Sequence, residues 1–175
     1  MRIAILCGVA AAFAIAAFFY LRDTSGTPPS GPSAFDVDRV LVEKAKRRLT
    51  LYDGATAVKS YPISLGGNPL GHKQQQGDRR TPEGLYVLDW RNPNSKFHLS
   101  LHVSYPDLAD RESAARRGVN PGGDIMVHGL PNGLGAFADY MLKRDWTDGC
   151  IAVTNETIEE IWLNVKDGTP IEIRP

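Results

Sequence analysis

Short runs of alternating apolar and polar residues mark much of the chain beyond residue 39 and predict β-strands. The runs Leu49–Tyr52 and Ala57–Tyr61 flank Asp53-Gly54, a pair of residues common in hairpin turns. Two further strands are predicted over Leu85–Trp90 and Phe97–Ser104. In the last of these, His and Ser alternate with Leu and Val, so one face is polar and either meets water or lines a cleft.

Helical patterns are confined to short segments. Residues 106–119 mix small apolar and charged residues, which is typical of a short surface helix, and residues 136–142 predict another. A clearer pattern follows Thr154-Asn155, whose side chains can cap a helix, and places Ile158 and Ile161 on one face. Residues 170–173 are expected to form a closing edge strand. The patterns together predict a mostly β domain, a β-rich α+β fold with a few short helices.

The N-terminal run Ile3–Leu21 contains no charged residue and approaches the roughly 20 apolar residues that cross a bilayer as a helix. Arg2 precedes this run, whereas Arg22 and Asp23 cancel beyond it, so the charge bias places the N-terminus in the cytoplasm and the rest outside. An uncleaved inner-membrane anchor is favoured over a cleaved signal peptide, whose apolar region is typically about 7–15 residues long.

Composition divides the chain into three parts. Residues 1–22 are the predicted anchor or signal segment, residues 23–36 are a flexible linker rich in Ser, Pro and Gly, and residues 37–175 are one folded domain. The 20 basic and 20 acidic residues balance, and the basic ones are scattered, so nothing favours nucleic acid as a partner. We therefore expect an exported, periplasmic domain held at the inner membrane.

A cysteine and a histidine each stand where a predicted strand meets a glycine. Cys150 follows Gly149 and precedes the apolar run Ile151–Val153, whereas His128 ends an apolar strand of its own. A thiol can attack a carbonyl carbon when an imidazole takes its proton, and backbone N–H groups at a turn can hold the oxyanion. The other cysteine, Cys7, lies in the N-terminal apolar run, so the predicted domain has a single thiol.

Other interpretations of these residues stay open. A lone cysteine is often a small buried apolar residue, and a histidine at a strand end is often only a hydrogen-bonding group. A metal site could draw on several side chains, but no pair of them has the close spacing of zinc motifs, and we expect no metal and no cofactor. The candidate ligands are His72, His98, His102, His128, Asp148 and Cys150.

The segments His128-Gly129 and Thr147–Ile151 resemble the signature of the L,D-transpeptidase catalytic domain, the YkuD-like family. The resemblance extends upstream to Ser64–Gly67 and Gly77–Tyr86, and so covers most of the chain after about residue 39. It implies an L,D-transpeptidase-like β-sandwich. It also implies a cysteine acyltransferase that acts on peptidoglycan stem peptides through a thioester and so cross-links or remodels the cell wall.

The chemistry of a thiol nucleophile gives the surrounding residues expected roles. His128 is expected to act as the base and to lower the thiol pKa, and the resemblance implies that the backbone carbonyl of Gly129 orients its ring. The backbone N–H groups of Gly149 and Cys150 are the expected oxyanion donors. Thr147 and Asp148 are supporting positions, and the candidate substrate contacts are His102, Arg80 and Trp146.

Two positions depart from the family's pattern. Asp148 occupies the place of a histidine, and Ala152 the place of an arginine two residues after the cysteine. A carboxylate beside a thiol raises its pKa, so Asp148 is expected to point away or to be paired. If water rather than an amine takes the acyl group, the same site is a carboxypeptidase, an endopeptidase or an amidase. A wall-binding module without activity is a further alternative.

Overall fold

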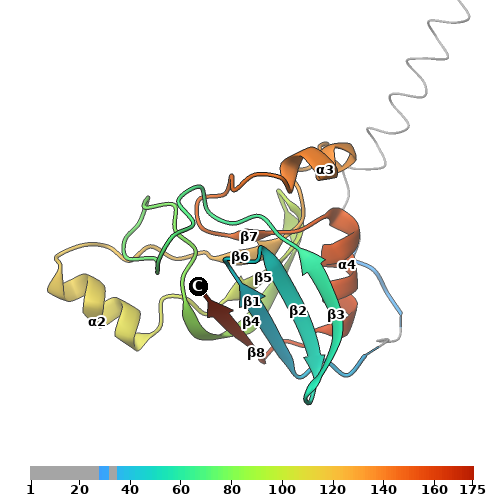
Figure 1. Cartoon of the computed structure of the whole chain (residues 1–175), viewed down its shortest axis with the longest axis horizontal. Helices are drawn as coiled ribbons and strands as arrows, with labels where there is room; N and C mark the ends of the chain where they lie inside the picture. Colours follow the sequence, from blue (N-terminus) through green and yellow to red (C-terminus); the bar gives the residue numbers. More distant parts are fainter. Residues whose placement is uncertain (1–27, 32–34) are drawn as a thin grey trace, which may run out of the picture.

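The computed structural model describes residues 28–31 and 35–175. The predicted anchor, residues 1–22, and the choice between anchor and signal peptide lie outside these residues, as does part of the linker. Among the described residues, no helix is both long and apolar enough to span a membrane. Figure 1 shows the folded domain that follows.

The strands form one hydrogen-bonded sheet of eight, in the order β3-β2-β1-β8-β4-β5-β6-β7. Two of the strand pairs, β1 with β8 and β6 with β7, are parallel. The strands are β1 (Arg39–Glu43), β2 (Arg48–Asp53), β3 (Thr56–Pro62), β4 (Gly84–Ser95), β5 (His98–Val103), β6 (Met126–His128), β7 (Ile151–Ala152) and β8 (Thr169–Arg174). The helices are α2 (Leu108–Arg116), α3 (Ala138–Met141) and α4 (Asn155–Asn164), with the short 3-10 helix η1 (Gly135–Phe137) before α3.

The predicted hairpin is confirmed, because β2 and β3 are antiparallel and Asp53 pairs with Thr56 across the turn. Gly54 has a φ of 56°, a left-handed conformation that glycine adopts at little cost. The predicted helices correspond to α2, α3 and α4. Thr154 caps α4 as expected, since its hydroxyl accepts from the Thr157 N–H at 3.1 Å.

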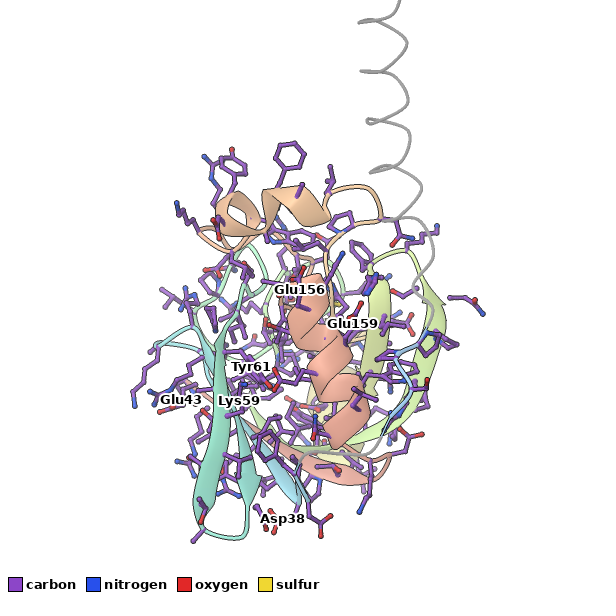
Figure 2. The ribbon with its side chains drawn as sticks, turned by 90° about the vertical axis from the view of Figure 1, so that its right-hand side faces the viewer. Asp38, Glu43, Lys59, Tyr61, Glu156 and Glu159 are labelled. Atoms are coloured by element: carbon purple, nitrogen blue, oxygen red, sulfur yellow. The ribbon has the colours of Figure 1, made fainter. Side chains whose placement is uncertain are left out.

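The sheet curls around α4, which lies between β2 and β3 on one side and β4 and β5 on the other (Figure 2). Contacts with β5 and β6 hold one side of the helix, and Lys59 of β3 pairs with Glu160 of α4 at 3.0 Å. Ile158 and Ile161 are buried in the core that the strands form, and each such side chain contributes about 1.5–3 kcal/mol by burial. The predicted fold class, mostly β with a few short helices, is confirmed.

The predicted place of the last strand is wrong. β8 lies within the sheet, parallel to β1 and antiparallel to β4, and is not an edge strand. Pro170 has no N–H to donate, but the ladder with β1 begins only at Ile171, so the missing donor is tolerated. β8 thereby joins the N-terminal strands to the strands around Cys150.

The water-facing alternative for the polar side of β5 is wrong for His98 and Ser100, which are both buried where α4 packs against this strand. Ser100 stands opposite His128 in the pairing of β5 with β6. His98 Nε2 lies 2.7 Å from Glu159 Oε1 of α4. His98 therefore helps to fix the helix to the sheet.

The long segment between β3 and β4 is tied down beside the cysteine. Asp78 accepts hydrogen bonds from three backbone N–H groups of this segment and from Lys73 Nζ at 2.8 Å. Although burial raises its pKa, these hydrogen bonds lower the pKa of Asp78 to about 2. A bridge pairs Gly66 with Thr147, so the start of the segment runs alongside the turn that precedes Cys150.

Candidate active site

Cys150 lies at the turn into β7, next to the strand that ends with His128. In the parallel pair of β6 and β7, His128 stands opposite Ala152. Two residues back along β6, the backbone N–H of Met126 is 3.4 Å from Cys150 Sγ. Strands about 4.8 Å apart that rise about 3.3 Å per residue separate the Cα atoms of Cys150 and His128 by roughly 8 Å. Two side chains directed toward each other can close that separation.

Gly149 allows the chain to turn immediately before the thiol. Its φ is 130°, a conformation that residues with a side chain rarely adopt. A Cβ atom at this position would lie 2.6 Å from the backbone oxygen of Arg80 and 3.2 Å from the side chain of Ile125. Both the turn and the close packing beneath it therefore require glycine.

The imidazole of His128 is 3% exposed and oriented by the backbone. Its Nδ1 lies 2.6 Å from the carbonyl oxygen of Gly129. Because a carbonyl oxygen only accepts, Nδ1 carries the proton, and Nε2 of the neutral ring keeps a lone pair. This is the tautomer that a general base needs.

The start of α4 fixes the turn that follows His128. Asn155 Oδ1 accepts from the Leu130 N–H at 2.9 Å. A Cβ atom at Gly129 would lie 2.8 Å from the same oxygen, so the close approach depends on glycine. Sequence reasoning treated Asn155 only as a capping residue, whereas the structure makes it a support for the carbonyl that orients His128.

Burial sets the charge of the histidine. Desolvation lowers the pKa of His128 to about 4, and the hydrogen bond to Gly129 opposes this shift only in part. Two aromatic rings lie against the imidazole, that of Phe97 at a centroid distance of 4.6 Å and that of Trp146 at 5.8 Å. His128 is therefore neutral near pH 7.

The expected lowering of the thiol pKa is wrong for the resting site. Burial raises the pKa of Cys150, and the N–H of Met126 opposes this shift only in part. Among the charged groups, Asp148 and Asp124 raise the pKa and Lys73 lowers it. The thiol and the imidazole are thus both neutral at pH 7.

Thr147 braces the cysteine turn from within. Its hydroxyl donates to the backbone oxygen of Cys150 at 2.7 Å and accepts from the N–H of Gly149 at 3.2 Å. The Gly149 N–H is therefore already engaged, which differs from its expected role as an oxyanion donor. The N–H of Met126, which faces Sγ, is a donor beside the reacting atom that the sequence did not indicate.

A hollow of about 400 Å³ is lined in part by residues that neighbour Cys150. Asp124 belongs to its wall, and the backbone oxygen of Asp124 is 3.5 Å from Cys150 Sγ. Asp148 lies at the same hollow with its side chain 93% exposed, and its Oδ1 pairs with Arg79 Nε at 3.4 Å. The prediction that this carboxylate is paired is confirmed.

The predicted substrate contacts lie in different places. Trp146 packs against His128, and its indole Nε1 is buried without a hydrogen-bond partner in the part of the chain that the structure describes. The guanidinium of Arg80 points away from the hollow, since its Nη1 donates to the backbone oxygen of His72 at 3.4 Å. Only the backbone of Arg80 reaches the cysteine turn, under Gly149.

His102 contacts neither the thiol nor His128. Its Nδ1 lies 2.6 Å from Asp89 Oδ1, and its ring stacks on Trp90 at a centroid distance of 4.9 Å. Both partners belong to β4, so the contacts of His102 join β5 to β4. The structure does not bring it to the candidate site.

Within the described ranges, no three His, Cys, Asp or Glu side chains come close enough together to hold a metal ion. Each histidine outside the site has its own carboxylate partner. These pairs are His72 with Asp110, His98 with Glu159 and His102 with Asp89.

Sequence reasoning missed three charged residues that line the hollow, which are Lys73, Arg79 and Asp124. It chose Arg80 instead of its neighbour Arg79. Arg79 has a φ of 57°, a left-handed backbone conformation that is uncommon for residues other than glycine. Nothing in the residue types signals that conformation.

Comparison with known proteins identifies the family. The model of the YkuD family, the L,D-transpeptidase catalytic domain, matches residues 37–173. A protein of Escherichia coli K12 named "Putative L,D-transpeptidase YafK" is 29% identical over 130 residues, which are 70% of this chain and 45% of that protein.

Solved structures have the same fold. The helical cell shape determining protein Pgp2 of Campylobacter jejuni is 24% identical with a TM-score of 0.61, over 90% of this chain and 54% of that one. Bd1075 of Bdellovibrio bacteriovorus is 28% identical with a TM-score of 0.55, over 82% of this chain and 50% of that one. An L,D-transpeptidase of Mycobacterium smegmatis, 14% identical with a TM-score of 0.52 over 80% of this chain and 59% of that one, is alike in fold alone.

The chain spans about half the length of the relatives that it matches. The family model covers Cys150, His128 and nearly all of the described domain. The chain therefore belongs to the family of L,D-transpeptidase catalytic domains.

Proposed function

We propose that this protein is a cysteine-dependent acyltransferase that acts on peptidoglycan stem peptides outside the cytoplasm. Membership of the family supports a peptidoglycan-modifying enzyme. The observation that supports the chemistry best is the pairing of β6 and β7, which sets Cys150 near a buried, neutral His128 whose Nδ1 is bound to Gly129. A thiol, a base in the correct tautomer and a hollow beside the sulfur are the requirements of acyl transfer.

In the proposed first half-reaction, Cys150 Sγ attacks the peptide carbonyl next to a terminal D-amino acid while His128 Nε2 takes the thiol proton. The carbonyl oxygen becomes an oxyanion, and the Met126 N–H beside Sγ is positioned to stabilise negative charge that develops at the sulfur. The tetrahedral intermediate collapses, the C–N bond breaks, and His128 returns the proton to the leaving amine. The acyl group remains on Cys150 as a thioester.

In the second half-reaction, an amine of another stem peptide attacks the thioester and gives a cross-link. His128 takes the proton of the attacking amine and returns it to the departing thiolate. Water in place of the amine would give a shortened stem peptide by the same steps, which is the hydrolytic alternative. Ala152 stands where the family has an arginine, so the sequence near the cysteine does not select transpeptidation over hydrolysis.

Incubation with purified muropeptides tests the proposal, with products identified by mass. Joined stems support transpeptidation, shortened stems support hydrolysis, and neither product would contradict both. A Cys150→Ala variant that folds normally by far-ultraviolet circular dichroism should form no product. Turnover by that variant would overturn the role of the thiol.

A further inference from the structure

The two cations that line the hollow differ in how firmly they are held. Lys73 is 3% exposed, and its Nζ donates to Asp78 Oδ1 at 2.8 Å and to the backbone oxygen of Gln75 at 3.2 Å. The side chain of Arg79 is 51% exposed, and its contacts are long, 3.4 Å to Asp148 Oδ1 and 3.5 Å to the backbone oxygen of Trp146. Arg79 is thus the cation of the hollow that a ligand can engage.

The partner of Arg79 is also easily displaced. Asp148 has a side chain that is almost fully exposed, so its carboxylate can rotate into water without losing a buried contact. Exposed ion pairs of this kind contribute little to stability. A guanidinium, by contrast, binds a second carboxylate through two parallel hydrogen bonds when its planar edge is accessible.

From this arrangement we propose that Arg79 binds the free C-terminal carboxylate of the acyl-donor peptide, and that Asp148 pairs with the same guanidinium group when no substrate is present. The inference rests on the proposed function, since the carboxylate that Arg79 would bind belongs to the terminal D-amino acid that leaves when Cys150 is acylated. Arg79 is then a specificity-determining residue, and the enzyme selects donors that end in a carboxylate.

The length of the donor's last residue and the position of the hollow are both compatible with this assignment. In a peptide, the terminal carboxylate carbon is three bonds of about 1.3–1.5 Å from the carbonyl carbon that Cys150 attacks. Asp124, whose backbone oxygen lies 3.5 Å from Cys150 Sγ, shares the wall of the hollow with Arg79. A donor whose carbonyl lies at the sulfur and whose C-terminus runs past Asp124 can therefore place its carboxylate in the hollow that Arg79 lines.

The test compares a stem tetrapeptide with the same peptide ending in a carboxamide. Hydrogen bonds to charged groups typically contribute enough to change affinity about 10- to 100-fold, so the wild type should prefer the acid by that factor in kcat/KM. In Arg79→Gln the preference should fall toward one. Arg116→Gln is the matched control, because Arg116 is an exposed arginine of α2 that pairs with Glu112 at 3.9 Å and does not line the hollow. The acid preference of this variant should equal that of the wild type.

A second variant removes the competing carboxylate. Asp148→Asn should improve use of the acid peptide about two- to fivefold, the amount that an exposed ion pair typically contributes, with less effect on the carboxamide. An Arg79→Gln variant that keeps the acid preference, or loses activity equally on both peptides, would overturn the inference.

Binding to the Cys150→Ala variant separates this inference from the proposed reaction. Calorimetric titration of that variant with the acid and the carboxamide measures recognition without chemistry. Equal affinities would overturn the role of Arg79 even if the wild type turns over both peptides. A preference for the acid that Arg79→Gln abolishes would support it even if the wild type forms no product, in which case only the proposed function fails.

Discussion

The thiol of Cys150 and the imidazole of His128 are both neutral in the resting site, because burial disfavours the charged form of each. An ion pair of thiolate and imidazolium, familiar from other cysteine enzymes, would need the opposite shift of both pKa values. In the proposed reaction, the thiol therefore stays weakly reactive until a substrate arrives, and His128 then acts as a general base during attack.

Replacement of His128 by glutamine distinguishes a general base from a pre-formed ion pair of thiolate and imidazolium. His128→Gln keeps a hydrogen-bonding side chain but cannot take a proton, so turnover of muropeptides should fall by about 10²–10⁴-fold. Alkylation of Cys150 by iodoacetamide at pH 7 should change little, since the resting thiol is already neutral. A large loss of alkylation in this variant would instead indicate a pre-formed ion pair.

Burial of His128 also makes stability depend on pH. Its pKa is about 4 in the folded domain and about 6.5 in the unfolded chain, so above pH 6.5 the residue is neutral in both states. Between pH 6.5 and 4 the unfolded chain binds more protons, and the free energy of unfolding falls as the pH falls. At pH 5 the loss should be about 2 kcal/mol relative to pH 7, from about 1.5 units at 1.36 kcal/mol each.

Urea unfolding at pH 7 and pH 5 measures this loss. Carboxyl groups titrate in the same range, so the informative quantity is the difference between the wild type and His128→Gln. The variant should lose about 2 kcal/mol less than the wild type over this interval. Equal losses in the two proteins would mean that His128 is not held neutral by burial.

At the scale of elements, the turn between Trp146 and β7 sets the position of the thiol. Gly149→Ala should displace this turn, because the new Cβ would meet the backbone oxygen of Arg80 and the φ of 130° is strained for alanine. Gly118→Ala is a matched control, since Gly118 also has a positive φ, 67°, but has open space around it. The control should lose only the roughly 1–2 kcal/mol of a left-handed residue and keep activity.

Thermal unfolding and muropeptide turnover check this pair of variants. We expect Gly149→Ala to lose more stability than the control and to lose turnover at temperatures where it remains folded. Normal turnover in folded Gly149→Ala would show that the turn tolerates a side chain and that its exact course does not position Cys150.

Elements set by neighbouring residues were predictable from the sequence, whereas those set by the curvature of the sheet were not. The Asp53-Gly54 hairpin and the helix capped by Thr154 follow from local patterns. The central place of β8 and the burial of His98 depend on how the sheet closes around α4. The same limit applies to the site, where Cys150 and His128 stand out in the sequence but Arg79 is distinguished from Arg80 only by a backbone turn.

At the scale of the whole molecule, the sequence predicts that residues 3–21 hold the domain at the inner membrane. Cells that express the full chain with a C-terminal tag should yield the full-length protein in the inner-membrane fraction. Extraction should need detergent and should not follow a salt wash, because the prediction attributes membrane attachment to an uncharged apolar segment and not to surface charge. A shortened, soluble form would show instead that the segment is a cleaved signal peptide.

In the proposed reaction the acyl group passes through Cys150. Intact mass after rapid mixing with a stem tetrapeptide measures this directly, because a thioester adds the mass of the acyl group to the protein. We expect one adduct on the wild type, located at Cys150 by peptide mapping, slower adduct formation in His128→Gln and none in Cys150→Ala. Product formation without any adduct in the wild type, or an adduct on Cys150→Ala, would contradict it.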